Sequence, residues 1–165
     1  LWDLGAGSGC LSLEAAALLP RGRVVALERE ESRVSLIREN RRRIGIPHLD
    51  IVHGSAPDAL DGLPDPDAVF IGGGLGGARN PNGRILPEAV AARLKPGGRM
   101  VAAAALLSTL NTLLDFARER GLRHSVMQIQ AAESAPLAGS LTLKPLNPVF
   151  LIGIFPGDAP DRRLP

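Results

Sequence analysis

The residues of this chain best suited to chemistry are a run of glycines and two carboxylates near its start. Every second residue from Gly5 to Gly9 is glycine, in the stretch DLGAGSG. Glycine permits a tight turn and lets a ligand approach the backbone closely, and a helix after the turn offers unpaired N–H groups. Glu28 ends the next apolar run, at about the 20-residue spacing at which an acid accepts ribose hydroxyls. The pattern therefore predicts a nucleoside-binding turn.

Asp3 indicates which charge the bound nucleoside carries. A carboxylate two residues before the first glycine would repel a pyrophosphate but attract a positively charged sulfonium amino acid, whose amino group needs an anion or a carbonyl nearby. Cys10 stands where the dinucleotide-binding fingerprint requires Gly or Ala. A nicotinamide-dependent oxidoreductase is therefore a weak alternative, and a purely structural glycine turn is another.

Strands and helices that alternate along the chain must position this turn. Such alternation predicts an α/β fold with a mainly parallel sheet and helices on both faces, and ligands bind at the carboxyl ends of its strands. No helix separates the last two strands, so we expect the final strand to be antiparallel. The expected strands are 1–4, 23–28, 49–53, 68–71, 99–105, 123–130 and 148–155, and the expected helices are 9–19, 30–44, 84–94 and 107–120.

Composition fits one domain of residues 1–155, followed by a flexible tail at 156–165 (PGDAPDRRLP). Because the sequence begins inside a strand, we expect its lead-in to be missing. The segment 131–147, rich in Ser, Pro and Gly, connects the last two strands. The 19 basic and 17 acidic residues leave a net charge of +2, which indicates a mixed-charge surface rather than a basic field. A single Cys favours a reducing cytoplasm. The absence of a long apolar run excludes a membrane span.

The turn resembles motif I (DxGxGxG) of the Rossmann-like class I methyltransferases that use S-adenosylmethionine (SAM). The stretches LWDLGAGSG, VVALER, IVHGSAPDAL and DAVFIGGG together resemble the decarboxylating precorrin C15-methyltransferases of cobalamin biosynthesis, over roughly residues 1–105. Motif I is shared by all such methyltransferases, and the run HGSAP with FIGGG is the more specific part. The family usually carries a segment before the first strand that helps to cover the site.

The resemblance implies SAM as cofactor and precorrin-6B as substrate, methylated at C15 and decarboxylated at the ring C acetate. No metal is expected, because the three His and one Cys show no ligand spacing, and no catalytic acid or base is named. The resemblance also implies a homo-oligomer, a tetramer to which the region 137–155 contributes, and a C5-methyltransferase domain as a fused or separate partner. The SAM-binding residues it implies are Asp3, Gly5, Ala6, Gly7, Ser8, Gly9, Glu28, Arg29, Gly54, Ser55, Ala56, Ile71 and Gly72.

The loop after the fourth strand is where the methyl acceptor is expected. Small residues there leave space for it, and arginines can pair with the carboxylates of the tetrapyrrole. The substrate-binding candidates are Gly73, Gly74, Arg79 and Arg84, with Asn80 beside them. Solvated surface charge is the alternative for both arginines, just as a helix cap is the alternative for Ser55.

Other functions stay open at this point. A methyltransferase of RNA or of a protein side chain shares motif I, although RNA binding favours a basic stripe with stacking aromatics, and only 3% of this chain is aromatic. A non-catalytic SAM-binding module would not need a glycine-lined mouth.

We expect Cys10 to pack beneath the turn and His53 to be a buried histidine with satisfied hydrogen bonds.

Overall fold

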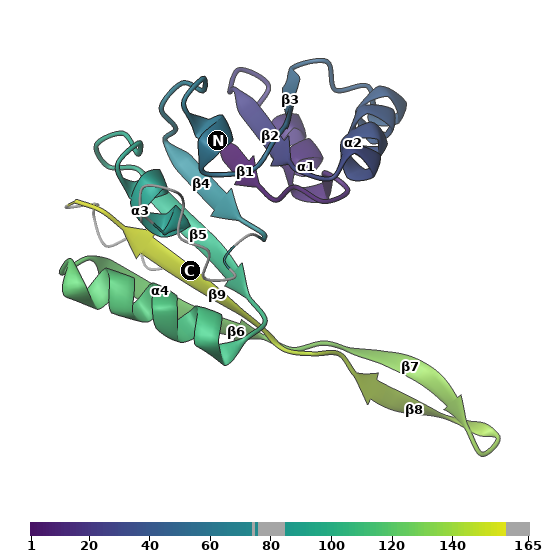
Figure 1. The fold of residues 1–165 in the computed structure, drawn as a ribbon. Coiled ribbons are helices and arrows are strands. Elements are labelled where there is room, and N and C mark those ends of the chain that lie inside the picture. Colours follow the sequence, from purple (N-terminus) through teal and green to yellow (C-terminus); the bar gives the residue numbers. More distant parts are fainter. Residues whose placement is uncertain (74, 76–84, 158–165) are drawn as a thin grey trace.

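The computed structural model describes residues 1–73, 75 and 85–157, which form a sheet flanked by helices and a projecting hairpin (Figure 1). The sheet consists of β1 (Trp2–Leu4), β2 (Val24–Glu28), β3 (Leu49–His53), β4 (Ala68–Ile71), β5 (Arg99–Ala104), β6 (Arg123–Ile129) and β9 (Val149–Phe155). The helices are α1 (Cys10–Leu18), α2 (Glu31–Ile44), α3 (Leu86–Ala91) and α4 (Leu107–Glu119), with a 3-10 turn at Asp58–Leu60.

The seven strands lie in the order β3-β2-β1-β4-β5-β9-β6. In this sheet β9 runs antiparallel to both of its neighbours, β5 and β6, whereas the other described strand pairs are parallel. The predicted α/β class, with a mostly parallel seven-stranded sheet and an antiparallel final strand, is therefore confirmed. The chain leaves β1 toward β2 and β3, then crosses to β4 on the other side, so the strand order reverses between β1 and β4. Such a switch point is where open α/β sheets bind ligands.

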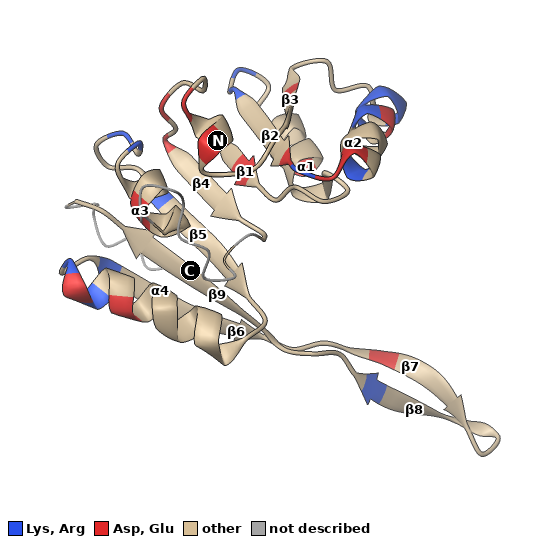
Figure 2. Ribbon diagram, in the orientation of Figure 1, with Lys and Arg blue, Asp and Glu red and all other residues tan. Residues whose placement is uncertain are grey.

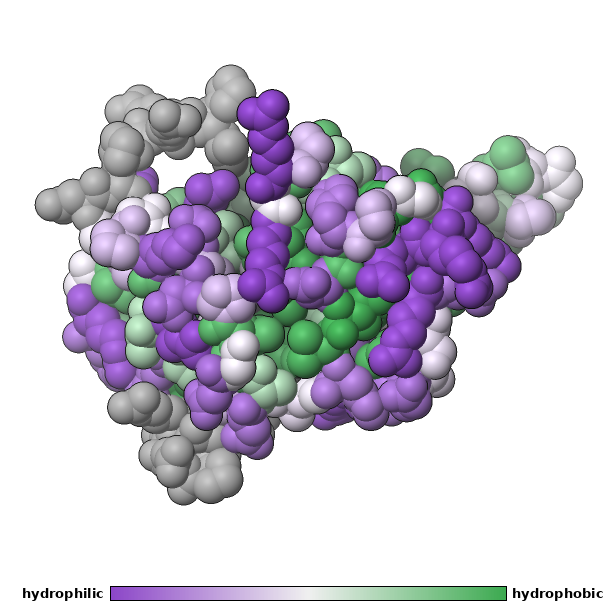
Figure 3. Space-filling view, turned by 90° about the horizontal axis from the view of Figure 1, so that it is seen from above, coloured by the Kyte–Doolittle hydropathy of each residue, from purple (hydrophilic) through white to green (hydrophobic). Residues whose placement is uncertain are grey.

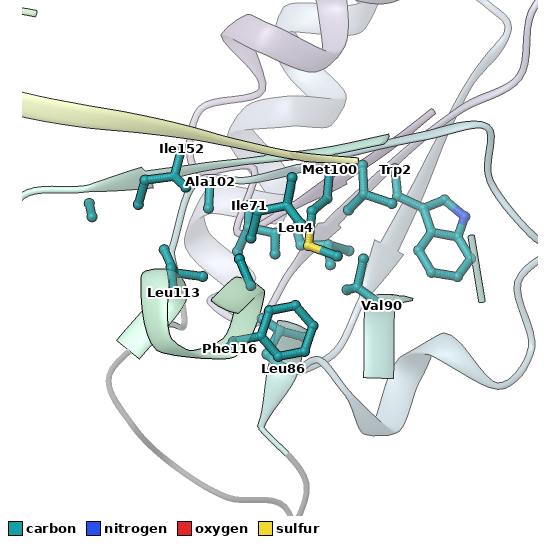
Figure 4. Packing of buried hydrophobic residues seen from close by; sticks show 14 of the residues in the cluster. Trp2, Leu4, Ile71, Leu86, Val90, Met100, Ala102, Leu113, Phe116 and Ile152 are labelled. Atoms are coloured by element: carbon teal, nitrogen blue, oxygen red, sulfur yellow. The ribbon is translucent and has the colours of Figure 1, made fainter. Parts of the chain in front are cut away.

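Two apolar clusters show which helices cover which face. Alternate residues of β2 point to opposite sides: Val25 and Leu27 join one cluster, while Val24 and Ala26 join the other. The larger cluster packs the first face against α3 and α4, and Figure 4 shows Trp2 and Met100 among its members. The smaller cluster packs the second face, at β2 and β3, against α1 and α2. Trp2 is only 1% exposed and is part of this core.

The connection between β6 and β9 is itself a hairpin, which the sequence pattern did not reveal. Residues Ala132–Leu137 form β7 and Ser140–Pro145 form β8, and the two strands pair only with each other among the described residues. Ala138 and Gly139 both have positive φ, at 49° and 76°, as a two-residue hairpin turn requires. We refer to Ala132–Pro145 as the arm. It extends away from the body of the molecule (Figure 1).

The expected tail is only partly visible, because residues 158–165 lie outside the described residues. The expected helix 84–94 is shorter in the structure, where α3 ends at Ala91 and a turn follows. None of the helices in the described ranges combines the length and the apolar character needed to cross a lipid bilayer.

Candidate active site

The glycine turn lies directly after β1, at the carboxyl edge of the sheet. The backbone N–H groups of Gly5 and Ala6 both donate to the carbonyl oxygen of Leu27, at 2.9 and 3.1 Å, which fastens the turn to the end of β2. Gly5 has a φ of +77°, and a Cβ there would lie 3.0 Å from the backbone nitrogen of Gly73. Two chain segments therefore meet at Gly5 with room for no side chain, which explains the glycine that the sequence pattern singled out.

Glu28 joins the end of β2 to the turn. Its Oε2 accepts a hydrogen bond from the Gly7 N–H at 2.8 Å, and its Oε1 accepts from the N–H groups of Arg29 and Glu30 at 2.9 and 3.0 Å. Burial by itself would raise the pKa of the Glu28 carboxyl, but these three backbone donors and the charge of Arg33 outweigh it and lower the pKa. The residue is 4% exposed. It is therefore a charged acceptor at neutral pH, held rigidly at the mouth of the turn.

Asp3 is buried behind the turn rather than presented at its mouth. The residue is 1% exposed, and its Oδ2 accepts a short hydrogen bond from the hydroxyl of Ser12 on α1. Burial is the main reason why the pKa of the Asp3 carboxyl is raised, and the Ser12 hydrogen bonds offset only part of that effect. In this geometry Asp3 connects β1 to α1 and fixes where the helix begins relative to the turn. Ser12 was not singled out from the sequence, because nothing local marks it as the partner of Asp3.

Two side chains from neighbouring elements hold the rim of the site. The Nδ2 of Asn40 on α2 donates to the Ser8 carbonyl at 3.1 Å. His53 at the end of β3 has Nε2 2.9 Å from the Arg29 carbonyl oxygen and Nδ1 2.9 Å from a carboxylate oxygen of Glu31. Neither Asn40 nor His53 was predicted to do this. The reading of His53 as a buried histidine is wrong, because its side chain is 46% exposed.

Cys10 also differs from its expected position. It lies exposed at the start of α1 instead of packing beneath the turn, and its sulfur is 3.1 Å from the Ser8 hydroxyl. The place beneath the turn is taken by Ile37 of α2, since a Cβ on Gly9 would lie 2.9 Å from that side chain. Gly9 thus lets α2 approach the turn closely, and the thiol stays outside.

The ends of β3 and β4 complete the edge with exposed or half-exposed backbone. Gly54 donates its N–H to the Glu28 carbonyl at 3.0 Å, and Gly72 donates to the Leu4 carbonyl at 2.9 Å. The Ser55 hydroxyl forms no cap on the following 3-10 turn, so the helix-cap reading is not supported. Ile71 is fully buried in the core, so only its backbone faces the edge.

The structure therefore brings most of the predicted cofactor residues together around one edge. The turn, Glu28, Arg29, the segment Gly54 to Ala56 and Gly72 all lie at the carboxyl ends of β1 to β4. Gly73 follows directly and has open space where a side chain would be. Gly74, Arg79, Asn80 and Arg84 lie outside the described residues.

Two leucines that the sequence analysis did not single out stand at the same edge, one strand further along. Leu106 and Leu107 follow the end of β5 and are 65% and 64% exposed. Since β5 pairs with β4, with Ala102 opposite Ile71, these leucines continue the edge beyond Gly72. An exposed pair of large apolar side chains beside a backbone-lined site is a surface suited to an apolar ligand face. The signal that could have found them is their position just after a strand, where the pattern expects ligand-binding loops.

Comparison with known proteins identifies the family. A family model described as "Precorrin methyltransferase domain" matches residues 1–154. The chain belongs to the precorrin methyltransferase domain family. It is 39% identical, over 149 residues, to a Sinorhizobium sp protein named precorrin-6Y C(5,15)-methyltransferase [decarboxylating], covering 90% of this chain and 34% of that relative. It is 37% identical over 153 residues to a Salmonella typhimurium cobalt-precorrin-6B C(15)-methyltransferase (decarboxylating), covering 92% of this chain and 76% of the relative. The chain thus spans about a third of the first relative and three quarters of the second.

Solved structures agree with this assignment. A precorrin-6y C5,15-methyltransferase from Geobacter metallireducens superposes with a TM-score of 0.82 at 36% identity, covering 94% of this chain and 79% of the other. A protein described as precorrin 8W decarboxylase from Methanobacterium thermoautotrophicum gives 0.79 at 30% identity, covering 93% and 79%. A SAM-dependent O-methyltransferase from Thermotoga maritima, at 21% identity and a TM-score of 0.68, covers 99% of this chain and 60% of the other and shares the fold alone. The domain therefore has the Rossmann-like fold of SAM-dependent methyltransferases.

Proposed function

We propose that this precorrin methyltransferase domain uses SAM to methylate C15 of precorrin-6B and decarboxylates the ring C acetate, in cobalamin biosynthesis. The observation that carries the proposal is the contact between Glu28 and Gly7, 2.8 Å long, which places a buried charged acceptor against a glycine turn. The relatives' names supply the acceptor carbon and the loss of carbon dioxide. Cytoplasmic location is part of the same proposal.

The residues of the site fit a nucleoside with a charged sulfur. A carboxylate offers about four lone-pair positions for hydrogen bonds, and three on Glu28 are taken by backbone donors. One ribose hydroxyl can therefore be accepted directly, and a second one requires the Gly7 N–H to turn away. A Cβ on Gly7 would meet no atom within 4 Å, so the space beside the turn is open to a ligand. Asp3, whose carboxylate is covered by Ser12, would act on the bound cofactor through the backbone of the turn.

The chemistry asks little of the protein beyond alignment. Bound SAM would supply an activated methyl group for an electron-rich carbon of the tetrapyrrole, with one C–S bond breaking as one C–C bond forms. Decarboxylation breaks a C–C bond, releases carbon dioxide and leaves a carbanion that takes up a proton, with the macrocycle as electron sink. The backbone of Gly5 and Gly72 would define where the acceptor can approach, and holding both reactants in line is worth several kcal/mol.

The exposed leucines after β5 would support the apolar face of the macrocycle. Neighbouring strands are about 4.8 Å apart, so an acceptor reaching from β1 across β4 and β5 spans about 10 Å of the edge, a distance suited to a tetrapyrrole. Leu107→Ser should raise the KM for precorrin-6B and leave SAM affinity unchanged. Leu18→Ser is the matched control, since Leu18 is 78% exposed at the far end of α1, away from this edge. Equal effects of both substitutions would contradict this substrate position.

The carboxylates of the substrate would be held by Arg79 and Arg84. Arg79→Ala should raise the KM for the tetrapyrrole while SAM binds as before, because a bidentate ion pair to the substrate is lost. A parallel loss of SAM affinity would instead assign Arg79 to the cofactor or to the fold.

The domain would assemble through its arm and work with a C5-methyltransferase. Leu137, Leu141 and Leu143 are 61%, 71% and 70% exposed on the arm, and exposed apolar side chains gathered in one place are typical of an interaction site. Figure 3 shows the arm extending from the body with apolar residues on its surface. A second copy of the chain is the proposed occupant, up to a tetramer. The fused Sinorhizobium relative, of which this chain matches 34%, supports the link to C5 methylation.

The direct test of the proposed function is the mass of the product formed from labelled SAM and precorrin-6B. A gain of one methyl group with loss of carbon dioxide is expected, and a gain of methyl alone would separate the two steps. Glu28→Gln should weaken SAM binding by about 1–3 kcal/mol in calorimetry, because ribose and backbone contacts to a charged acceptor are lost. Glu30→Gln, a neighbouring exposed carboxylate, should bind SAM normally. Equal affinities in the two variants would refute the role of Glu28.

A further inference from the structure

The segment after Glu28 is contacted by the side chain of His53, which has no role in the proposed reaction. His53 lies opposite Glu28 in the register of β2 and β3. Its Nε2 is 2.9 Å from the Arg29 carbonyl oxygen, and its Nδ1 is 2.9 Å from Oε2 of Glu31, the first residue of α2. The imidazole therefore bridges the backbone next to Glu28 to the start of the following helix.

Both atoms that face the imidazole accept hydrogen bonds and cannot donate them. A carbonyl oxygen and a carboxylate oxygen each need an N–H, whereas a neutral imidazole carries only one. Both contacts are satisfied at once only by the protonated ring. The carboxylate is also fixed from its other side, because the guanidinium of Arg38 donates to Oε1 of Glu31 at 3.2 Å. Glu31 is therefore held in place to receive the second N–H.

We propose that His53 is a positioning residue for the ribose acceptor Glu28, and that it holds this position as an imidazolium. The proposal rests on SAM being the cofactor of this site. Of the two contacts, the one with the Arg29 carbonyl restrains the peptide group between residues 29 and 30, whose N–H, on Glu30, donates to Glu28 Oε1. When the ring loses its proton, one of the two contacts is lost and the segment between β2 and α2 is less restrained. The expected consequence is weaker cofactor binding.

Charged groups lie near the imidazole on both elements that it contacts, β2 and α2. On the side of β2 they are Glu28, whose lowered pKa keeps it charged throughout, and the exposed ion pair of Arg29 with Glu30. On the side of α2 they are Glu31 and Arg38. Histidine ordinarily changes charge between pH 5 and 8. Burial raises the pKa of Asp3 behind the turn, and a slope due to Asp3 would persist in variants of His53. A slope of SAM affinity that disappears when His53 is replaced therefore reports the imidazole.

Three variants separate the charge of the ring from its bulk. His53→Gln is always neutral, and both of its N–H donors are on one nitrogen, so it does not replace the two separate ring nitrogens. His53→Arg is always charged and can donate to both. Glu31→Gln removes the carboxylate that demands the second N–H. Thermal unfolding at each pH confirms that the variants are folded before binding is compared.

The experiment is calorimetric titration of the full chain with SAM between pH 5.5 and 8. The native protein is expected to lose about two- to fivefold in affinity as the pH rises, the size that an exposed ion pair supports. His53→Gln should be weak and His53→Arg tight at every pH, with no slope in either. An unchanged slope in these variants, or no slope in the native protein, would overturn the role of His53 and leave SAM as the cofactor. No SAM binding at any pH would overturn both proposals.

Discussion

The strands that lead into the glycine turn and Glu28 are built in the opposite way to β6 and the arm that follows it. β1 and β2 are buried on both faces, with every residue of both strands inside the molecule. β6 and the arm are exposed along almost their whole length. Figure 2 shows the same contrast in charge: acidic and basic residues gather on α2 near the cofactor edge, whereas the arm carries only Glu133 on β7 and Lys144 on β8.

The enclosed strands hold the cofactor site rigidly, whereas the exposed arm offers surface that another molecule can contact. The glycine turn and Glu28 belong to strands that are enclosed on both faces, and their hydrogen bonds leave little freedom for the turn. The leucines of the arm lie away from the body, where the part of the chain that the structure describes gives them nothing to pack against. Substitutions near the turn should therefore lower stability and SAM affinity, whereas substitutions on the arm should alter assembly.

The largest loss of stability and of SAM binding is expected at Gly5, where the structure leaves no space for a side chain. Gly5→Ala combines a positive φ with a Cβ 3.0 Å from the Gly73 backbone, so the free energy of unfolding should fall by about 3 kcal/mol or more. SAM binding should fall with it, because the turn must move. Chemical denaturation and calorimetry measure both. Near-native stability would show that the two segments at the switch point are not packed as described.

A smaller loss is expected from removing the partner of the buried carboxylate. Ser12→Ala leaves Asp3 without its side-chain donor and should cost about 1–3 kcal/mol at neutral pH. Ser12 stabilises the charged form of Asp3, so this cost is present above the raised pKa of Asp3 and shrinks as the pH falls through it. Denaturation curves at pH 7 and at pH 4 should show the difference between the two proteins narrowing. A constant difference would mean that Ser12 acts through packing alone.

Two glycines with similar backbone angles sharpen the comparison further. Gly7 and Gly45 have φ of +62° and +76°, and a Cβ at either would meet no atom within 4 Å. Alanine at each position should cost a similar 1–2 kcal/mol or so, from backbone strain alone. Only Gly7→Ala should weaken SAM binding, by about tenfold, the effect of one misplaced methyl group. Equal SAM affinities in the two variants would place the cofactor away from the turn.

The smallest effect on folding is expected on the arm. Leu141→Ser with Leu143→Ser changes exposed side chains, so the free energy of unfolding of the isolated domain should change by no more than about 0.5 kcal/mol. The mass in solution, measured by light scattering, should fall from that of an oligomer to that of a monomer. Leu36→Ser on α2, another exposed leucine, should leave the mass unchanged. An unaltered oligomer in the arm variant would refute assembly through the arm.

Local patterns in the sequence were sufficient for the framework of the molecule. The spacing of glycine in the turn, the acid at the end of the second apolar run and the alternation of strands with helices led to the fold class and to Glu28. These features are encoded locally, since a positive φ selects glycine and a buried parallel strand selects a short apolar run. The resemblance of four stretches then pointed to the family that residues 1–154 match.

Contacts between distant residues were decided only by the tertiary structure. Ser12 covers Asp3, Asn40 reaches Ser8 across 32 residues, and His53 bridges two segments although it was read as buried. The arm escaped notice because its strands carry Pro and small polar residues and, among the described residues, pair only with each other. The type and spacing of residues predict whether a segment forms a helix or a strand. The partner that each side chain contacts depends on how that helix or strand packs. The chain's sequence by itself therefore determined the turn and its acid, and only packing decided which side chains hold them in place.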